Sequence, residues 1–374
     1  MSFTQQLVKD PDVLLLAPYP PPFGGVATHV RDLVEVLNRE GIDVGVANHY
    51  SLVPGESSVM FPLNRNPFRY WWVASKSRNP VLHYHHSTLA TLFAISMALK
   101  RNHAQVRVVT IHNDYLNPLL KRRSTRRIVR RLLSSFDFVI AVSDEIRHQL
   151  DGVVSAPMIV CPAYILDERA GAVRPEAEEL FPGSSPTLVV SAYEVDRTSD
   201  EADLYGLDVA ARVFAELRTR QLIRLGIFIA KEPRSKRDRD YLERIIQIAR
   251  STGDAEDIRC FFGEPLKPAL SESNVVYLRP SRTDGDAVSI REALVLGTPV
   301  VASDVARRPA EVSTVPIDDE AAWVSAIDDA LLAKTSPVLS PRDQAGVFHT
   351  DLFTASDYVD LYRRLIQDAV SSAG

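Results

Sequence analysis

The strongest constraint on the fold is an alternation of short apolar runs with amphipathic segments, which occurs twice along the 374 residues. In the first half, the amphipathic segment 27–41 predicts a helix that ends at Gly41, because glycine is a common helix stop. Apolar runs that predict buried strands cover 13–19, 43–50, 81–86, 106–112 and 138–143. This βαβα rhythm predicts a parallel sheet with helices on both faces, whose ligands bind at the carboxyl ends of the strands.

The rhythm lapses over 167–186, which is rich in proline, glycine and charge and is typical of an interdomain linker. It then resumes. Strands are predicted over 187–193, 224–230, 258–263, 275–281 and 299–304, and helices over 207–220, 240–253 and 291–297. The prediction is therefore α/β, with one doubly wound Rossmann-like domain over 1–166 and a second over 187–350.

Charge separates the two halves. Residues 1–170 carry 19 basic and 14 acidic residues, a net charge of +5, whereas the remainder carries 24 and 34, a net charge of −10. A basic half suits an anionic membrane surface or a phosphorylated acceptor. No apolar stretch approaches a membrane span, and the N-terminus lacks a signal-peptide core, so we expect a cytoplasmic protein. Cys161 and Cys260 lie in apolar strand-like contexts, which favours small core residues over a disulfide.

The stretch 282–304 contains the most informative set of candidate functional residues. Two acids, Asp284 and Glu292, have seven residues between them, and Gly297, Thr298 and Pro299 lead into an apolar run that ends at Asp304. Such a string predicts a loop, a helix and a buried strand in quick succession. The simpler reading, acids that cap a helix beginning near Ser289, explains Asp286 better than the whole string.

This stretch resembles the donor-sugar motif of retaining GT-B glycosyltransferases, especially family 4. The first acid is Glu in most of that family and Asp here. The Thr-Asp-Gly-Asp loop, 283–286, is similar to that of a bacterial polysaccharide glycosyltransferase subgroup. The resemblance implies that Asp284 meets the donor sugar and Glu292 the ribose. It also implies that the backbone of the residues between them holds sugar and phosphate: Gly285, Asp286, Ala287, Val288 and Ser289.

The first half supports the same resemblance. Pro22–Val26 and the helix after it are similar to the family's opening motif, in which Gly24 and Gly25 take part and the second glycine lies against the donor phosphates. The alternative is a tight turn made by glycine alone. The segment 108–114 matches the family's strand-histidine element, which implies that His112 lies beside the reacting carbon. Acceptor-side candidates are His85, Asn113 and Asp114.

His83, His85 and His86 raise the question of a metal. In a strand, His83 and His85 share one face and His86 the other, and no carboxylate or cysteine in the sequence completes a ligand set. Family 4 enzymes generally need no metal. We therefore expect no metal and no cofactor, and interpret His83 as a packed strand residue. Ser143, after the strand 138–143, is interpreted as the cap of the following helix.

Residues 119–136 form a predicted basic amphipathic helix. Ile128, Val129, Leu132 and Leu133 share one arc. The opposite arc carries Arg123, Arg126, Arg127, Arg130 and Arg131. An ordinary helix that packs on the core and exposes a charged face to solvent would explain part of this pattern. Relatives that act on lipid-linked acceptors dock on membranes through such a surface. The resemblance therefore implies an anionic membrane as a partner. Nucleic acid is not favoured, because the sequence carries no zinc finger, recognition helix or stacking motif.

This sequence differs from the family pattern at the positions that bind the donor diphosphate. Most family members place Arg and Lys-Gly where this chain has Tyr193 and Tyr205–Gly206, so both usual cations are missing. We expect other cations to replace them; a less charged donor or lost catalysis are the alternatives. Replacement candidates at or near suitable loops are Arg282, Arg308, Lys231 and Arg197.

Together these features predict a GT-B fold with a cleft between the two domains and a final helix, about 354–374, that packs back on the first domain. The implied activity is a metal-independent hexosyltransferase that transfers a sugar from a nucleotide-sugar, with retention, to a saccharide or lipid-linked saccharide in bacterial cell-surface polysaccharide synthesis. It would act in the cytoplasm, at the inner face of the plasma membrane. The alternatives are a catalytically silent GT-B scaffold subunit and a nucleotide-sugar epimerase or phosphorylase.

Overall fold

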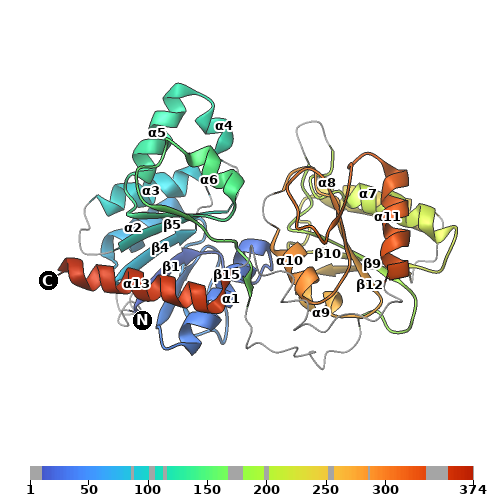
Figure 1. Ribbon diagram of the computed structural model, residues 1–374, viewed down its shortest axis with the longest axis horizontal. Coiled ribbons are helices and arrows are strands. Elements are labelled where there is room, and N and C mark those ends of the chain that lie inside the picture. The colour runs from blue at the N-terminus through green and yellow to red at the C-terminus, as the bar shows by residue number, and fades with distance from the viewer. Residues whose placement is uncertain are drawn as a thin grey trace. The chain divides into compact units, whose positions relative to one another are not determined.

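The chain forms two compact units, each built on a parallel sheet (Figure 1). The computed structural model describes residues 11–85, 88–100, 106–112, 116–166, 180–197, 202–251, 257–284, 287–333 and 353–373. The first unit comprises Met1–Pro20, Gly25–Arg169 and Asp351–Gly374, and the second comprises Pro21–Gly24 and Ala170–Thr350. Most of the predicted linker, 167–179, lies outside the described residues.

The sheet of the first unit has the order β3-β2-β1-β4-β5-β6-β7, with every neighbouring pair parallel. Its strands are β1 (Val13–Ala17), β2 (Val44–Asn48), β3 (Val59–Pro62), β4 (Val81–His85), β5 (Val106–Ile111), β6 (Phe138–Ala141) and β7 (Met158–Val160). A short parallel pair joins β8 (Ile165–Leu166) to β15 (Phe353–Thr354). The helices are α1 (Gly25–Arg39), α2 (Pro67–Lys76), α3 (Leu89–Leu99), α4 (Asn117–Leu120), α5 (Arg123–Leu133), α6 (Asp144–Leu150) and α13 (Ala355–Ala373).

The sheet of the second unit has the order β11-β10-β9-β12-β13-β14, also parallel throughout. Its strands are β9 (Thr187–Ala192), β10 (Arg224–Ile229), β11 (Ile258–Phe262), β12 (Val275–Arg279), β13 (Val300–Ser303) and β14 (Ser313–Val315). Its helices are α7 (Leu207–Arg218), α8 (Lys236–Arg250), α9 (Lys267–Leu270), α10 (Val288–Val295) and α11 (Glu320–Ala333). The strand order is that of a dinucleotide-binding fold, with its reversal between β9 and β12. The predicted doubly wound α/β class is therefore confirmed.

Local sequence explains where several elements end. The α1 helix stops at Arg39, and Gly41 takes a φ of +81° while its N–H donates to the carbonyl of Asn38, which is a left-handed helix terminus. Ser143 accepts from the N–H of Ile146 and caps α6, as the sequence predicts. The α8 helix begins at Lys236, four residues before the predicted start, because Ser235 caps it.

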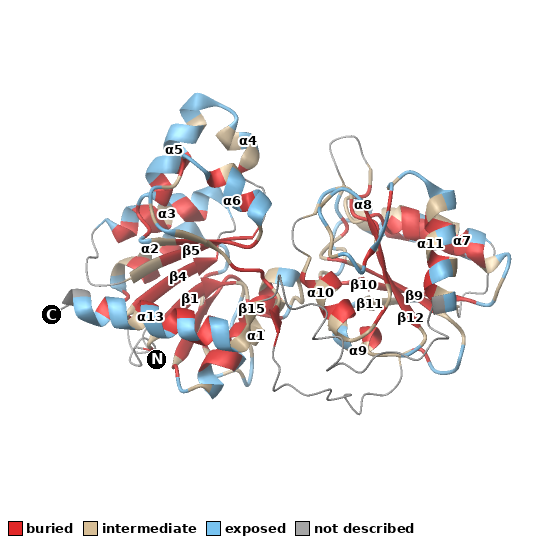
Figure 2. Cartoon of the chain, viewed as in Figure 1, coloured by how far each residue is buried: buried red, intermediate tan, exposed pale blue. Residues whose placement is uncertain are grey.

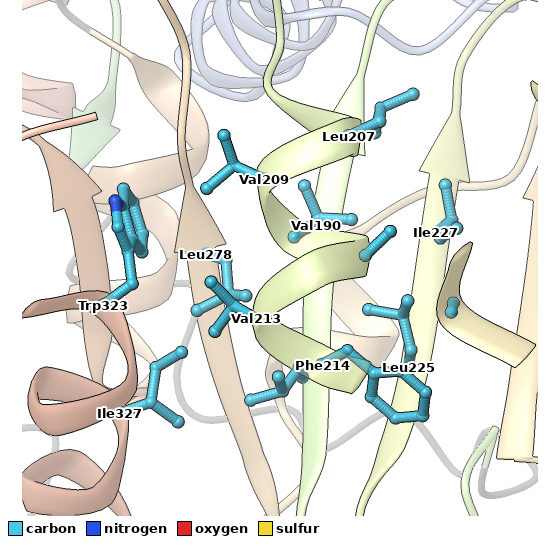
Figure 3. Packing of buried hydrophobic residues seen from close by; sticks show 14 of the residues in the cluster. Val190, Leu207, Val209, Val213, Phe214, Leu225, Ile227, Leu278, Trp323 and Ile327 are labelled. Atoms are coloured by element: carbon cyan, nitrogen blue, oxygen red, sulfur yellow. The ribbon is translucent and has the colours of Figure 1, made fainter. Parts of the chain in front are cut away.

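Burial follows the strands and the inner faces of the helices (Figure 2). In the second unit, Val213 and Phe214 of α7 pack over Val190 and Leu278 of the sheet, beside Trp323 of α11 (Figure 3). In the first unit, Tyr358 and Tyr362 of α13 join the core formed by β1 and α1. Each unit thus has its own hydrophobic core.

Two smaller expectations concern the cysteines and the possibility of a membrane-spanning helix. Neither Cys161 nor Cys260 is in a disulfide; Cys161 is buried and Cys260 is half-buried. Burial raises the pKa of the Cys161 thiol to about 12 and that of Cys260 to about 11, so both are protonated at neutral pH. Among the helices of the described residues, none combines the length and the apolarity needed to cross a membrane.

Candidate functional site

The predicted donor loop follows β12 in the second unit and leads into α10. Gly285 and Asp286 lie outside the described residues. Ala287 occupies the N-cap position of α10, with an extended backbone, and Val288 begins the helix, one residue before the predicted start near Ser289. The Ser289 hydroxyl accepts from the phenol of Tyr277 at 2.8 Å, which fixes the first turn of α10 against the sheet.

Asp284 is the centre of a buried ion network. Its carboxylate accepts from Nε and Nη2 of Arg279 at 3.0 and 3.1 Å, from Nη1 of Arg308 at 3.0 Å and from the hydroxyl of Ser281 at 3.2 Å. Burial alone would raise the pKa of Asp284, but Arg279 and Arg308 outweigh it and hold the pKa below its usual value. Asp284 is therefore ionised at neutral pH, and its role towards a donor sugar stays a prediction.

Arg279 is a site residue that the sequence reasoning missed. It is the last residue of β12, and its guanidinium lies 5.7 Å from the ring centroid of Tyr205. Burial lowers the pKa of Arg279, whereas Asp284 raises it, and the net pKa lies above the ordinary value. A cation at the carboxyl end of a strand was the available signal, because ligands of such sheets bind at that end.

The four cations proposed as replacements are already paired, to different degrees. Arg282 contacts Asp318 at 3.2 Å and Asp208 at 3.8 Å. Lys231 pairs with Glu194 and lies 5.2 Å from the ring centroid of Tyr193, and Arg197 lies 3.9 Å from Asp238.

Nε of Arg282 and Nη2 of Arg308 are both buried without a hydrogen-bond partner, but the side chain of Arg308 is 2% exposed whereas that of Arg282 is 22% exposed. A buried guanidinium nitrogen without a partner costs free energy, so Arg308 is the replacement candidate best placed to gain from an anion.

Glu292 and the glycines occupy tightly packed positions. Glu292 lies on α10 and is 8% exposed. Gly206 has a φ of +71°, and an added Cβ would lie 1.9 Å from the carbonyl oxygen of Pro280, so only glycine fits between α7 and the donor loop. Gly25 begins α1, and Gly24, grouped with the second unit, would bring an added Cβ to 2.7 Å from Cδ2 of Tyr193.

Histidines gather at the carboxyl ends of β4 and β5 in the first unit. Nδ1 of His85 and Nε2 of His112 are 2.8 Å apart. His83 is buried, and its two ring nitrogens contact the hydroxyls of Tyr362 and Thr110, which confirms it as a packed strand residue. His29 of α1 also belongs to this group. It was not identified from the sequence, because there it is only one of several residues on the buried face of a predicted helix. Asn113 and Asp114 lie outside the described residues.

Desolvation keeps these imidazoles neutral. Burial lowers the pKa of His29 to about 4 and that of His83 to about 3, and it lowers the pKa of His85 well below its usual value. At neutral pH each of the three can therefore accept through one ring nitrogen and donate through the other.

The basic helix α5 presents its arginines to solvent (Figure 2). Val129, Leu132 and Leu133 are buried, as the sequence predicts, whereas Ile128 is 52% exposed. The expected apolar arc is therefore narrower by one residue, because Ile128 lies at its edge beside Arg127. The exposed residues of the basic face are Arg123, Arg126, Arg127, Arg130 and Arg131.

Comparison with known proteins identifies the architecture. Residues 23–162 match the sequence model of the family described as Glycosyltransferase Family 4. A sucrose-phosphate synthase from Thermosynechococcus elongatus superposes with a TM-score of 0.68 at 16% identity, covering 96% of this chain and 99% of that chain. The chain has the GT-B fold.

Two further structures agree. A trehalose-phosphate synthase (UDP-forming) from Burkholderia xenovorans gives a TM-score of 0.66 at 14% identity, covering 96% of this chain and 99% of that one. A glycosyltransferase from Rickettsia africae gives 0.63 at 12% identity, covering 96% and 98%. Comparison with curated proteins found no match. The resemblance to GT-B glycosyltransferases is thus confirmed, and at these identities the superpositions support the fold alone.

Proposed function

We propose that this GT-B protein is a retaining glycosyltransferase that moves a hexose from a nucleotide-sugar to a hydroxyl of a saccharide or lipid-linked saccharide in bacterial cell-surface polysaccharide synthesis. The observation that carries the proposal is the position of the ion network. Arg279 ends β12, Asp284 follows that strand and Arg308 follows β13. The network therefore lies at the carboxyl ends of neighbouring strands, beside the reversal of strand order, which is where open α/β sheets bind ligands.

The charges suit a diphosphate leaving group. Arg308 offers a buried Nη2 without a hydrogen-bond partner, and the N-terminus of α10 adds its helix dipole. Donors aimed at the developing negative charge stabilise the transition state of the transfer. In this proposal Arg308 and Arg279 stand in for the family's usual Arg and Lys, and Arg282, Lys231 and Arg197 stay bound to carboxylates.

The transfer itself needs orientation more than covalent chemistry. By analogy with the family, the leaving diphosphate takes up the proton of the acceptor hydroxyl on the face from which it departs. The protein then contributes by holding donor and acceptor in register, with Glu292 on the ribose and His112 beside the sugar. This chemistry uses no metal ion.

A panel of nucleoside diphosphates tests this assignment. We expect at least one to stabilise the second unit against heat, by about 2.7 kcal/mol at 100 times its dissociation constant. Glu292→Ala should weaken that ligand about 10- to 100-fold, because a charged hydrogen bond to hydroxyls contributes about 1.5–3 kcal/mol. Differential scanning fluorimetry and isothermal titration calorimetry measure both quantities.

The matched control is Glu311→Ala, because Glu311 is an exposed acid in the same unit and should leave the affinity unchanged. Equal affinity in Glu292→Ala and the parent would remove the ribose assignment. If no diphosphate binds, the catalytically silent scaffold becomes the better account of this GT-B chain.

We further propose that the enzyme works at the cytoplasmic face of an anionic membrane, on which α5 docks. An apolar stripe on α3 supports this: Leu89, Phe93 and Met97 recur every four residues and are 39%, 54% and 42% exposed. The α3 helix packs against α5, and the Ser96 hydroxyl donates to the Leu132 carbonyl. A basic face beside an exposed apolar stripe suits a surface that attracts anionic lipid and inserts shallowly.

Flotation with phosphatidylserine liposomes tests the docking surface. We expect the parent protein to float, and the triple variant Arg126→Gln/Arg127→Gln/Arg130→Gln to bind about 100-fold more weakly, because each charge near the surface contributes about 1 kcal/mol. The control is Arg234→Gln/Lys236→Gln/Arg239→Gln, which removes three exposed charges from the second unit. Equal flotation of the two triple variants would contradict docking through α5.

A further inference from the structure

Three histidines of the first unit converge although they are far apart in sequence. His29 lies on α1, His85 ends β4 and His112 follows β5. Each offers a ring nitrogen, and the three nitrogens lie within 4.8 Å of one another. The ring centroids of His29 and His85 are 5.6 Å apart, those of His29 and His112 5.5 Å, and those of His85 and His112 5.1 Å.

Two ring nitrogens in this group have unmet hydrogen-bonding capacity. Nδ1 of His29 and Nε2 of His85 are buried and have no hydrogen-bond partner, in residues that are 3% and 0% exposed. Leaving such a polar atom unpaired in the interior costs about 1–3 kcal/mol. Two of them in one cluster indicate that something absent from the protein chain itself completes the group.

The surroundings of His29 are those of a metal ligand. Its other ring nitrogen donates to the backbone carbonyl of Ala163, which fixes the tautomer and leaves Nδ1 with its lone pair. Metal-binding histidines usually donate their second N–H to a carbonyl or carboxylate in this way. A packing role alone does not explain an unpartnered Nδ1 in a ring whose centroid lies 5.6 Å from that of His85 and 5.5 Å from that of His112.

His83 packs against the three-histidine cluster but does not belong to it. Its ring stacks on that of His85 with centroids 4.4 Å apart, and hydrogen bonds to Tyr362 and Thr110 occupy both of its nitrogens. Because Tyr362 belongs to α13, the C-terminal helix helps to set the orientation of the His85 ring.

We propose that His29, His85 and His112 bind one divalent transition-metal ion, with Zn²⁺ as the best fit. Three imidazole ligands with an open fourth position form a known class of zinc site. Zn–N bonds of about 2.0–2.1 Å place tetrahedral ligand nitrogens about 3.3 Å apart, so the rings must close in and the hydrogen bond between His85 and His112 must open.

The fourth ligand should be an anion. Three neutral imidazoles leave the charge of the ion uncompensated, and within the described residues no carboxylate or cysteine joins the group. Hydroxide is the simplest ligand for that position, because Zn²⁺ lowers the pKa of bound water to about 7. The ion would tie α1 to the ends of β4 and β5. His112 is also the residue proposed beside the donor sugar, so an ion bound here would share that residue with the proposed glycosyl transfer, which itself uses no metal.

Titration of the metal-free full-length protein with Zn²⁺ and Co²⁺ tests the site. We expect one equivalent of Co²⁺ to give the intense visible absorption of a tetrahedral complex, and Zn²⁺ to displace it. His29→Gln and His85→Gln should each weaken Zn²⁺ binding by more than about 100-fold, since loss of an outer-shell partner alone costs about 10- to 100-fold. His148→Gln is the control, because His148 is exposed and lies on α6, away from the cluster.

Either of two results overturns the proposal: the weak absorption of six-coordinate Co²⁺ in the parent protein, or an unchanged Zn²⁺ affinity in both glutamine variants. Fluorescence of Trp71 and Trp72 checks that each variant is folded, and the cobalt spectrum of the parent decides the matter if a variant fails that check. Nucleoside diphosphate binding is measured separately, so failure of the metal site leaves the glycosyltransferase proposal untouched.

Discussion

Asp284→Asn should lower the free energy of unfolding of the second unit by about 3–5 kcal/mol, the usual cost of breaking a buried ion pair by removing one partner. The carboxylate of Asp284 is the shared acceptor of Arg279 and Arg308, whose donor atoms lie 3.0–3.1 Å from it. An amide has nearly the same size but no charge, and its nitrogen would face two guanidinium groups. Both arginines would then keep their charge with no anion to offset it.

Urea denaturation in a Trp71→Phe/Trp72→Phe background measures this effect, because Trp323 is then the remaining tryptophan and it is buried in the second unit. The control is Asp318→Asn, whose side chain is 81% exposed and pairs with Arg282 at the surface. Such exposed pairs contribute about 0–1 kcal/mol. A loss below about 1 kcal/mol in Asp284→Asn would mean that water or the residues around the loop already neutralise the two arginines.

The unfolding of Asp284→Asn can also be measured with a nucleoside diphosphate present. If a diphosphate binds Arg308 and Arg279, it supplies the anion that Asp284→Asn removes, so the nucleotide should stabilise the variant at least as much as the parent. The charge network thus links the folding of the donor loop to its binding role, and the two can be separated by measuring unfolding with and without ligand.

Much of the fold could be predicted because each unit repeats two periodicities. Continuous apolar runs predict strands buried on both faces, and amphipathic segments predict the helices that cover them. The short edge strands β3, β7 and β14 and the helix α11 escaped prediction. The β14 strand has three residues, two of them exposed, and α11 carries apolar residues around much of its circumference, so neither shows a clear pattern.

The site was less accessible to sequence reasoning, because its partners come from separate elements. Asp284 was identified through its motif, yet one of its two arginine partners, Arg279, was interpreted only as part of a strand. His85 and His112 were identified as strand-end residues, whereas His29 comes from α1, 56 residues before His85. Proximity of this kind depends on the sheet order β2-β1-β4-β5, which local patterns do not encode.

The histidines give the second large prediction, a selective loss of the first unit in acid. Burial lowers the pKa of His29 and of His49 to about 4 and that of His83 to about 3, against 6.5 in the unfolded chain. At a pH between the folded-state and unfolded-state pKa values, the unfolded chain binds more protons than the folded one. The histidines therefore cost no stability above pH 6.5, and the free energy of unfolding decreases as the pH falls below that value. At pH 4, each of these histidines should have lowered the free energy of unfolding of the first unit by about 3 kcal/mol.

The second unit should respond in the opposite direction. The described part of that unit contains no histidine, and burial, followed by the charge of Asp208, raises the pKa of Asp203 to about 6 from 3.8. Here the folded state binds the extra proton, so acidification from pH 7 to pH 4 should stabilise this unit by about 2.4 kcal/mol through Asp203. One chain would then show two unfolding transitions that separate as the pH falls.

Denaturant titrations between pH 7.5 and pH 4, with a chelator present to keep the protein metal-free, measure both units. Trp71 and Trp72 report on the first unit in a Trp323→Phe variant, and Trp323 reports on the second in the variant lacking the other two. His29→Gln should reduce the pH slope of the first transition by about one proton, or 1.4 kcal/mol per pH unit. Transitions that move together would contradict the neutral, buried state of the imidazoles.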